Sequence, residues 1–121
     1  MNMLSLVVDD DEAIRSYIQS ILHSENFETL EAEDGGQALE IVRMLDGGVD
    51  LIVSDIQMPG GDGITFAKAV RASYPFVPVI LVSGSAEADP DFEFVEKPFS
   101  WAIMARVIRR VVARSVLGSA A

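Results

Sequence analysis

Five side chains able to bind phosphate or a metal ion lie at the ends of short apolar runs of this chain. Three are carboxylates, one is a hydroxyl and one is an ammonium group: Asp9, Asp10, Asp55, Ser83 and Lys97. If the runs are parallel strands of one sheet, their carboxyl ends meet at one edge, where open α/β sheets carry their functional sites. The spacing therefore predicts one charged site at the edge of a sheet.

Three carboxylates at one edge repel one another, so their negative charge must be offset by a cation or by protonation. Two unit charges about 5 Å apart repel by roughly 3 kcal/mol at an effective dielectric constant near 20. Oxygen ligands without Cys or His favour Mg²⁺, or Mn²⁺, which typically binds one or two carboxylates together with a substrate phosphate. An aspartate in such a site can attack phosphorus and form an aspartyl phosphate. Lys97 would neutralise one phosphoryl oxygen, and the hydroxyl of Ser83 would donate to another.

The remaining pattern supplies the elements that position these groups. Apolar runs alternate with segments of helical period, which is typical of a parallel sheet with crossover helices. The runs are continuously apolar, which predicts helices on both faces of the sheet. We predict strands at 3–8, 27–32, 51–53, 77–82 and 92–96 and a loop at 58–63. We predict a first helix capped by Asp11 or Glu12, helices over 37–45 and 64–72, and a long last helix capped by Ser100.

Length and composition narrow the function classes. The 121 residues fit one domain, with no second domain expected. The 19 acidic and 9 basic residues give a net charge of −10, so we expect no direct binding to nucleic acid. No cysteine is present, and no apolar run approaches the roughly 20 residues of a membrane span. The N-terminus lacks a signal-peptide pattern. We therefore expect a soluble cytoplasmic protein without membrane contact.

At these residues the sequence resembles the receiver domain of two-component response regulators. The matching pieces occur in order over nearly the whole chain, and each would be weak alone. They are Leu6–Asp10, Ser54–Pro59, Asp62–Gly63, Val79–Gly84 and Lys97–Phe99. The resemblance implies a flavodoxin-like three-layer α/β sandwich with five parallel strands in the order 2-1-3-4-5. It also implies a signalling domain that phosphorylates itself and loses phosphate slowly, but is not an enzyme in the usual sense.

The resemblance also implies a role for each site residue. Asp55 would accept phosphate from a histidine kinase or a histidine phosphotransfer protein, with Lys97 sensing the phosphate. The metal ligands would be Asp9, Asp10, Asp55 and the backbone carbonyl of Gln57. Ser83 would be the switch hydroxyl and Phe94 the rotating aromatic, and the Lys97–Pro98 peptide bond would be cis. The added charge at Asp55 would bias an equilibrium between two conformations.

One segment departs from the family pattern. Eight residues, 84–91, separate Ser83 from the fifth predicted strand, whereas a crossover usually needs about 10–12. The segment also contains Gly84, Pro90 and several acids, which disfavour a helix. We predict that the fourth helix is reduced to a turn or absent. In this shortened form the sequence resembles the receivers that are attached to hybrid histidine kinases.

Two other classes of function fit these residues less well than a receiver does. Phosphohydrolases that resemble haloacid dehalogenases carry two acids two positions apart on the first strand, whereas Asp9 and Asp10 are adjacent. An interaction domain that keeps only the receiver shape would not need all five of the residues at the sheet edge, which we call the rim residues. Both alternatives would be separated from a receiver by incubation with Mg²⁺ and acetyl phosphate.

Basic and aromatic residues outside the rim have simpler interpretations. The last predicted helix carries four arginines, Arg106, Arg109, Arg110 and Arg114, which form either a docking patch or, as we favour, a solvated face. His23 is interpreted as structural rather than as a phosphoacceptor, and Trp101 as a partly exposed packing residue.

Overall fold

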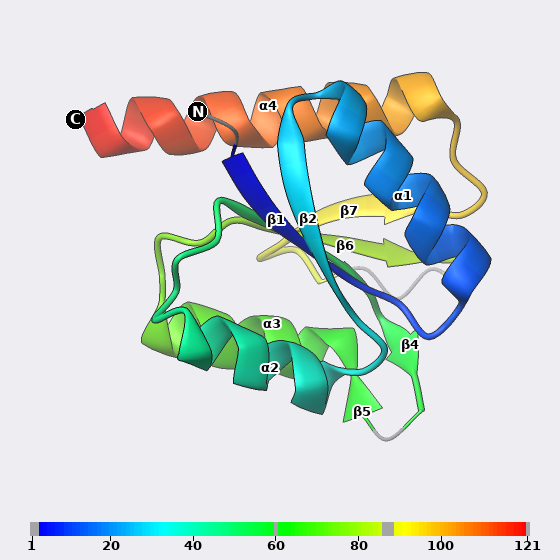
Figure 1. Ribbon diagram of the computed structural model, residues 1–121, viewed down its shortest axis with the longest axis horizontal. Coiled ribbons are helices and arrows are strands. Elements are labelled where there is room, and N and C mark those ends of the chain that lie inside the picture. Colours follow the sequence, from blue (N-terminus) through cyan, green and yellow to red (C-terminus); the bar gives the residue numbers. More distant parts are fainter. Residues whose placement is uncertain (1–2, 60, 86–88, 121) are drawn as a thin grey trace.

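The computed structural model describes residues 3–59, 61–85 and 89–120, with the backbone alone for residue 61 and residues 116–120. Strands and helices alternate along most of the chain (Figure 1). In chain order the elements are β1 (Met3–Val8), α1 (Glu12–Ser24), β2 (Phe27–Ala32), α2 (Gly35–Met44), β3 (Leu51–Asp55), β4 (Gln57–Met58), β5 (Gly61–Asp62), α3 (Gly63–Ser73), β6 (Val79–Ser83), β7 (Glu93–Glu96) and α4 (Trp101–Ala120).

Five of the strands form one parallel sheet in the order β2-β1-β3-β6-β7. Counted within this sheet, the order is 2-1-3-4-5, and the predicted flavodoxin-like fold is confirmed. The central strands are in register near their carboxyl ends, with Val8 opposite Ser54 and Asp55 opposite Val82. This register brings the ends of β1, β3 and β6 to the same edge of the sheet.

Helices cover both faces of the sheet (Figure 1). Helices α1 and α4 lie on one face, and α2 and α3 lie on the other. Alternate side chains of the apolar strands enter the two cores: Val7 packs on the α1/α4 side, and Leu6 and Val8 pack on the α2/α3 side. Each of these three side chains is fully buried. Burial on both faces explains why the strands are continuously apolar.

The predicted capping residues precede α1 and α4. Helix α2 also begins after a capping residue, but its start is earlier than predicted. The carboxylate of Asp11 accepts from the N–H groups of Ala13 and Ile14, and the hydroxyl of Ser100 accepts from Ile103. Helix α2 begins at Gly35 rather than at the predicted residue 37. The physical reason is that the carboxylate of Asp34 caps the helix by accepting from the N–H of Gln37 at 2.7 Å.

The predicted loop over residues 58–63 was only partly correct. Strands β4 and β5 form a short antiparallel pair there, with Gln57 opposite Asp62. The carboxylate of Asp62 accepts from the N–H of Thr65 at 2.7 Å, so α3 begins at Gly63, one residue earlier than predicted. The sequence pattern did not indicate this hairpin, because each of its strands has only two residues.

The connection from β6 to β7 contains no helix in its described residues, 84, 85 and 89–92. Residues 86–88 of the predicted shortened helix lie outside the described part. Helix α3 contacts the end of this connection. The guanidinium of Arg71 donates to the carbonyl of Asp91 at 2.6 Å and lies 4.0 Å from the ring centre of Phe92. Lys68 pairs with Asp89 at 3.7 Å. These contacts hold the described end of the connection against α3.

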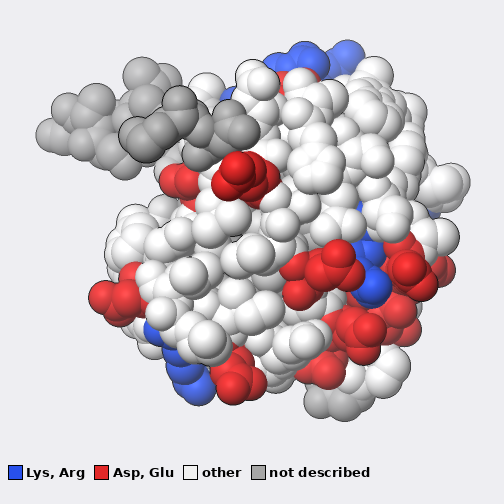
Figure 2. All heavy atoms as spheres, in the orientation of Figure 1, with Lys and Arg blue, Asp and Glu red and all other residues white. Residues whose placement is uncertain are grey.

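Acidic side chains dominate one side of the surface. Figure 2 shows them gathered at the lower right, the side on which Figure 1 places β4 and the start of α1. Three of the four α4 arginines pair with acids of this chain: Arg109 with Glu25, and Arg110 and Arg114 with Glu93. Their interpretation as a solvated face rather than a docking patch stays a prediction. Among the described helices, none has both the length and the apolar character needed to cross a membrane.

His23 and Trp101 have neighbours that fit their structural interpretations. The ring nitrogen Nε2 of His23 lies 3.1 Å from the hydroxyl of Thr29, which links the end of α1 to β2. Trp101 is 41% exposed and packs edge-on against Tyr17. Neither side chain has a described contact with the rim carboxylates.

Candidate functional site

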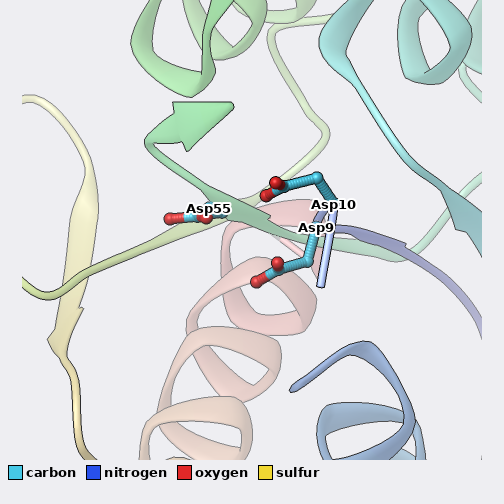
Figure 3. Close-up of side chains that lie close together, drawn as sticks. All are labelled: Asp9, Asp10 and Asp55. Carbon is cyan, nitrogen blue, oxygen red and sulfur yellow. The ribbon is translucent and has the colours of Figure 1, made fainter. Parts of the chain in front are cut away.

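The predicted rim residues come together at the carboxyl edge of the sheet. Asp9 follows β1, Asp55 ends β3, Ser83 ends β6 and Lys97 follows β7. The side chains of Asp9, Asp10 and Asp55 lie close together at this edge (Figure 3). The strand order explains the meeting, because β1 and β3 are neighbours and β3 pairs with β6.

The three carboxylates, Asp9, Asp10 and Asp55, form what we call the carboxylate cluster. Each offers one oxygen, and these oxygens lie within 4.8 Å of one another. Asp9 and Asp55 are 1% and 7% exposed, whereas Asp10 is open to solvent. A set of carboxylate oxygens with one open side fits Mg²⁺ or Mn²⁺, which prefer oxygen ligands and keep some of their waters. The cluster could therefore hold a divalent cation, and the carbonyl of Gln57 stays a predicted further ligand.

Lys97 lies between two members of the cluster. Its Nζ atom is 3.4 Å from Oδ2 of Asp9 and 3.4 Å from Oδ2 of Asp55, and its side chain is 20% exposed. The peptide bond between Lys97 and Pro98 is cis. The ammonium group thus offsets part of the repulsion between the two buried carboxylates, and it is placed to contact an oxygen of any group bound to Asp55.

Asp55 has an unusual electrostatic environment. Its pKa is raised above the ordinary aspartate value, first by burial and second by the negative charge of Asp9. The ammonium of Lys97 and the N–H of Gln57, which donates to Oδ1 of Asp55 at 3.3 Å, partly oppose this rise in pKa. The ionised Asp55 is therefore under-compensated by the protein's own groups, which favours a bound cation.

Ser83 lies at the same edge but is hydrogen-bonded away from the cluster. Its hydroxyl is buried, accepts from the N–H of Ser85 at 3.1 Å and lies 3.2 Å from the hydroxyl of Ser85. The side-chain amide of Gln57 donates to that same Ser85 hydroxyl at 3.1 Å. No local sequence pattern predicts this link, because its two side chains lie 28 positions apart in the chain.

Phe94 lies on the α2/α3 side of the sheet. It is half-buried, packs against the apolar core of that face and is opposite Leu81 in the register of β6 and β7. In this register Ser83 is opposite Glu96. Phe94 therefore lies in the neighbouring strand, two residues before the position opposite Ser83.

Two further residues shape the site and were given no role by the sequence analysis. A Cβ atom on Gly63 would lie 2.0 Å from the carbonyl oxygen of Asp55, so only glycine lets the start of α3 approach the end of β3 this closely. Arg15 is a buried cation that donates to the backbone carbonyl of Asp9 at 2.7 Å. The Asp62–Gly63 motif was visible in the sequence, but its steric reason was not.

The strand order and the charged carboxyl edge define a flavodoxin-like α/β domain with its site where the strand order reverses. Residues 5–106 match the family model described as the response regulator receiver domain, and the chain belongs to this family. Its members are regulatory domains of two-component signalling. The predicted family is therefore confirmed.

Individual relatives include receivers in several settings. The chain is 37% identical over 115 residues to the sensor kinase CckA of Brucella abortus, covering 88% of this chain and 12% of that kinase. It is 33% identical to the chemotaxis protein CheY of Pseudomonas aeruginosa, covering 93% of this chain and 98% of that protein. It is 32% identical to the transcriptional regulatory protein CpxR of Escherichia coli, of which it spans 49%.

A solved structure supports the same grouping. The receiver domain of the hybrid histidine kinase CckA superposes with a TM-score of 0.80 at 34% identity, covering 90% of this chain and 98% of that one. This similarity agrees with the resemblance to hybrid-kinase receivers that the short connection between β6 and β7 indicated.

Proposed function

We propose that this domain is a phosphorylation-controlled switch in which Asp55 accepts a phosphoryl group from a phosphohistidine. The donor would be a histidine kinase or a histidine phosphotransfer protein. The observation that carries the proposal is the convergence of Asp9, Asp10 and Asp55 within 4.8 Å, with the Lys97 ammonium 3.4 Å from two of the carboxylates. A set of acids this close, with a lysine among them, is suited to bind a cation beside a phosphoryl group.

In the transfer step, a carboxylate oxygen of Asp55 attacks the phosphorus atom of the phosphohistidine. The phosphorus–nitrogen bond breaks, its electron pair leaves with the imidazole, and the imidazole takes up a proton from solvent. The new oxygen–phosphorus bond makes Asp55 a mixed anhydride. Mg²⁺ held by Asp9, Asp10 and Asp55 would supply positive charge that offsets the charge of the phosphoryl oxygens. Lys97 would contact a second phosphoryl oxygen.

The test is incubation of the chain with Mg²⁺ and acetyl phosphate, followed by intact-mass measurement. We expect one phosphoryl group to be added per chain when Mg²⁺ is present, and none to be added when EDTA replaces Mg²⁺. Borohydride reduction and peptide mapping should locate the modification at Asp55. Absence of the adduct with Mg²⁺ present, or a modification mapped to another residue, would contradict the proposal. Rapid release of many equivalents of inorganic phosphate would instead indicate a phosphohydrolase.

The same proposal includes a conformational response. In the unmodified protein the Ser83 hydroxyl is engaged with Ser85, and Ser85 is held by Gln57. A phosphoryl group on Asp55 adds strong acceptor oxygens and roughly −1.5 to −2 charges. The Ser83 hydroxyl would give up its hydrogen bonds with Ser85 and donate to a phosphoryl oxygen instead. Phe94 would then turn toward the space that Ser83 leaves.

This response predicts a large change at the amide of Ser85, because its N–H loses the Ser83 hydroxyl as an acceptor. Two-dimensional ¹⁵N NMR before and after phosphorylation measures it. A Ser83→Ala variant, which lacks the acceptor in both states, should show a much smaller change at this amide. An unchanged Ser85 resonance in the phosphorylated wild type would contradict the proposed movement.

The proposal also includes a protein donor and a cytoplasmic location. A protein donor is supported by the similarity to a sensor kinase and to the receiver domain of a hybrid histidine kinase. The net charge of −10 and the acidic side in Figure 2 would repel nucleic acid, so the downstream partner is proposed to be a protein. The domain would regulate that partner rather than catalyse a reaction on an external substrate.

A further inference from the structure

Arg15 is a buried cation that the proposed phosphorylation does not use. It lies in the first turn of α1 and is 6% exposed, although the sequence around it is acidic. Arginine is seldom buried unless its guanidinium is fully paired. Its partners therefore indicate what the residue does.

The guanidinium of Arg15 joins three parts of the fold. Nη1 donates to the backbone carbonyl of Asp9 at 2.7 Å, and Nε donates to the carboxylate of Glu31 on β2 at 3.0 Å. The second carboxylate oxygen of Glu31 accepts from the side chain of Gln19 at 3.3 Å. Arg15 is thus held in one orientation by β2 while it holds the residue after β1.

Asp9 is consequently fixed at each of its polar groups. Its N–H donates to the carbonyl of Ala32 at 3.1 Å, and its carbonyl accepts from Arg15. Its Oδ1 atom accepts from the N–H of Asp11 at 2.9 Å, which leaves Oδ2 facing Lys97. The main chain that carries both Asp9 and Asp10 is thereby held between β2 and α1.

We propose that Arg15 is a positioning residue for the metal-binding acids. By fixing the carbonyl of Asp9, it sets the direction in which the carboxylates of Asp9 and Asp10 face Asp55. Mg²⁺ and Mn²⁺ demand closely defined oxygen geometry, and groups that orient metal ligands commonly change affinity by 10- to 100-fold. This inference rests on the proposed function, because it concerns the cation site of that function.

Two substitutions separate positioning from charge. Arg15→Met removes a positive charge near the cluster, and by charge alone it would tighten the binding of a divalent cation. Arg15→Lys keeps the charge but loses the planar fork that reaches Asp9 and Glu31 together. If Arg15 positions the acids, both variants should bind the cation about tenfold more weakly than the wild type.

The measurement is the affinity for Mn²⁺, read from electron paramagnetic resonance of the free ion, without any phosphodonor. Arg109→Lys is the matched control, because Arg109 also pairs with a glutamate, Glu25, but has no described contact with the rim. Circular dichroism serves as the check that each variant is folded. In Arg15→Lys the amide of Asp11 should also exchange its hydrogen faster than in the wild type, because its acceptor, the Asp9 carboxylate, loses its fixed direction.

The outcomes are distinct. Weaker Mn²⁺ binding in both Arg15 variants, with wild-type affinity in Arg109→Lys, supports the positioning role. Unchanged or tighter binding in the folded Arg15 variants overturns it and leaves the proposed function intact. Equal losses in Arg109→Lys also overturn it, since they indicate a general loss of stability. A wild-type chain that binds no Mn²⁺ contradicts the cation site of the proposed function, and this inference with it.

Discussion

Replacing Asp55 with asparagine is expected to abolish phosphate uptake from acetyl phosphate, because the amide has no nucleophilic carboxylate oxygen. Asparagine has almost the same shape, and its Oδ1 atom can still accept from the N–H of Gln57, although the ion pair with Lys97 is lost. The loss should therefore come from chemistry rather than from misfolding. Intact-mass measurement after incubation with Mg²⁺ detects the adduct in the wild type and its absence in the variant.

The matched control is Asp91→Asn. Asp91 is exposed, and its described contact with Arg71 uses the backbone carbonyl, which the substitution leaves in place. This variant should take up one phosphoryl group at the wild-type rate. A phosphorylated Asp55→Asn protein would show that another residue is the acceptor, and the assignment of Asp55 would be wrong.

The same substitution should stabilise the protein when no divalent cation is present. Burial and the charge of Asp9 raise the pKa of Asp55, so its ionised form costs free energy in the native state. Removing that charge is expected to raise the free energy of unfolding at pH 7 by about 0.5–2 kcal/mol. Urea unfolding in EDTA, followed by circular dichroism, measures the difference.

The pH dependence of this difference has a defined sign. Because the pKa of Asp55 is higher in the native state than in the unfolded chain, the native state binds more protons between the two pKa values. Wild-type stability therefore falls as pH rises through that window, and the penalty is complete above the native pKa. The advantage of the asparagine variant should grow from the ordinary aspartate pKa upward and then level off. An advantage that grows as pH falls would contradict the raised pKa.

Replacing Gly63 with alanine is expected to destabilise the fold by about 3 kcal/mol or more, the upper end for overpacking in a rigid site. The added Cβ would lie 2.0 Å from the carbonyl oxygen and 2.9 Å from the carbonyl carbon of Asp55, and both are backbone atoms. Neither can turn aside as a flexible side chain could. Either α3 moves outward or the end of β3 shifts, and in both cases the carboxylate cluster is disturbed.

Urea unfolding monitored by circular dichroism measures this loss, and Gly36→Ala is its control. A Cβ on Gly36 would meet only the carboxylate of Asp34 at 3.4 Å, an ordinary contact, and the residue lies in α2. That variant should change stability by no more than about 1 kcal/mol, in the stabilising direction if at all. Equal stabilities of the two alanine variants would show that the approach of α3 to β3 is not sterically limiting.

The sequence pattern alone predicted the parallel sheet and the edge at which the site lies, and the resemblance to receiver domains supplied the strand order. Apolar runs at the observed strands identified a parallel sheet, and parallel strands place their carboxyl ends together. Asp9, Asp55 and Lys97 could therefore be assigned to one site, although 88 positions separate the first from the last. The boundaries were less predictable. Helix α2 began at the cap that Asp34 provides, and the hairpin of β4 and β5 had no periodic pattern.

Only the tertiary structure decided which residues support the site. A charged residue on the first turn of a helix is ordinarily solvated, and the burial of Arg15 depends on the approach of Glu31 from β2. The link from Gln57 to Ser85 depends likewise on the path between β6 and β7, and the steric role of Gly63 depends on how closely α3 approaches β3. Hydrophobic periodicity and turn residues act locally and can be read along the chain. Contacts between side chains of distant segments depend on register and packing distance, which are set only when the whole sheet and its helices assemble.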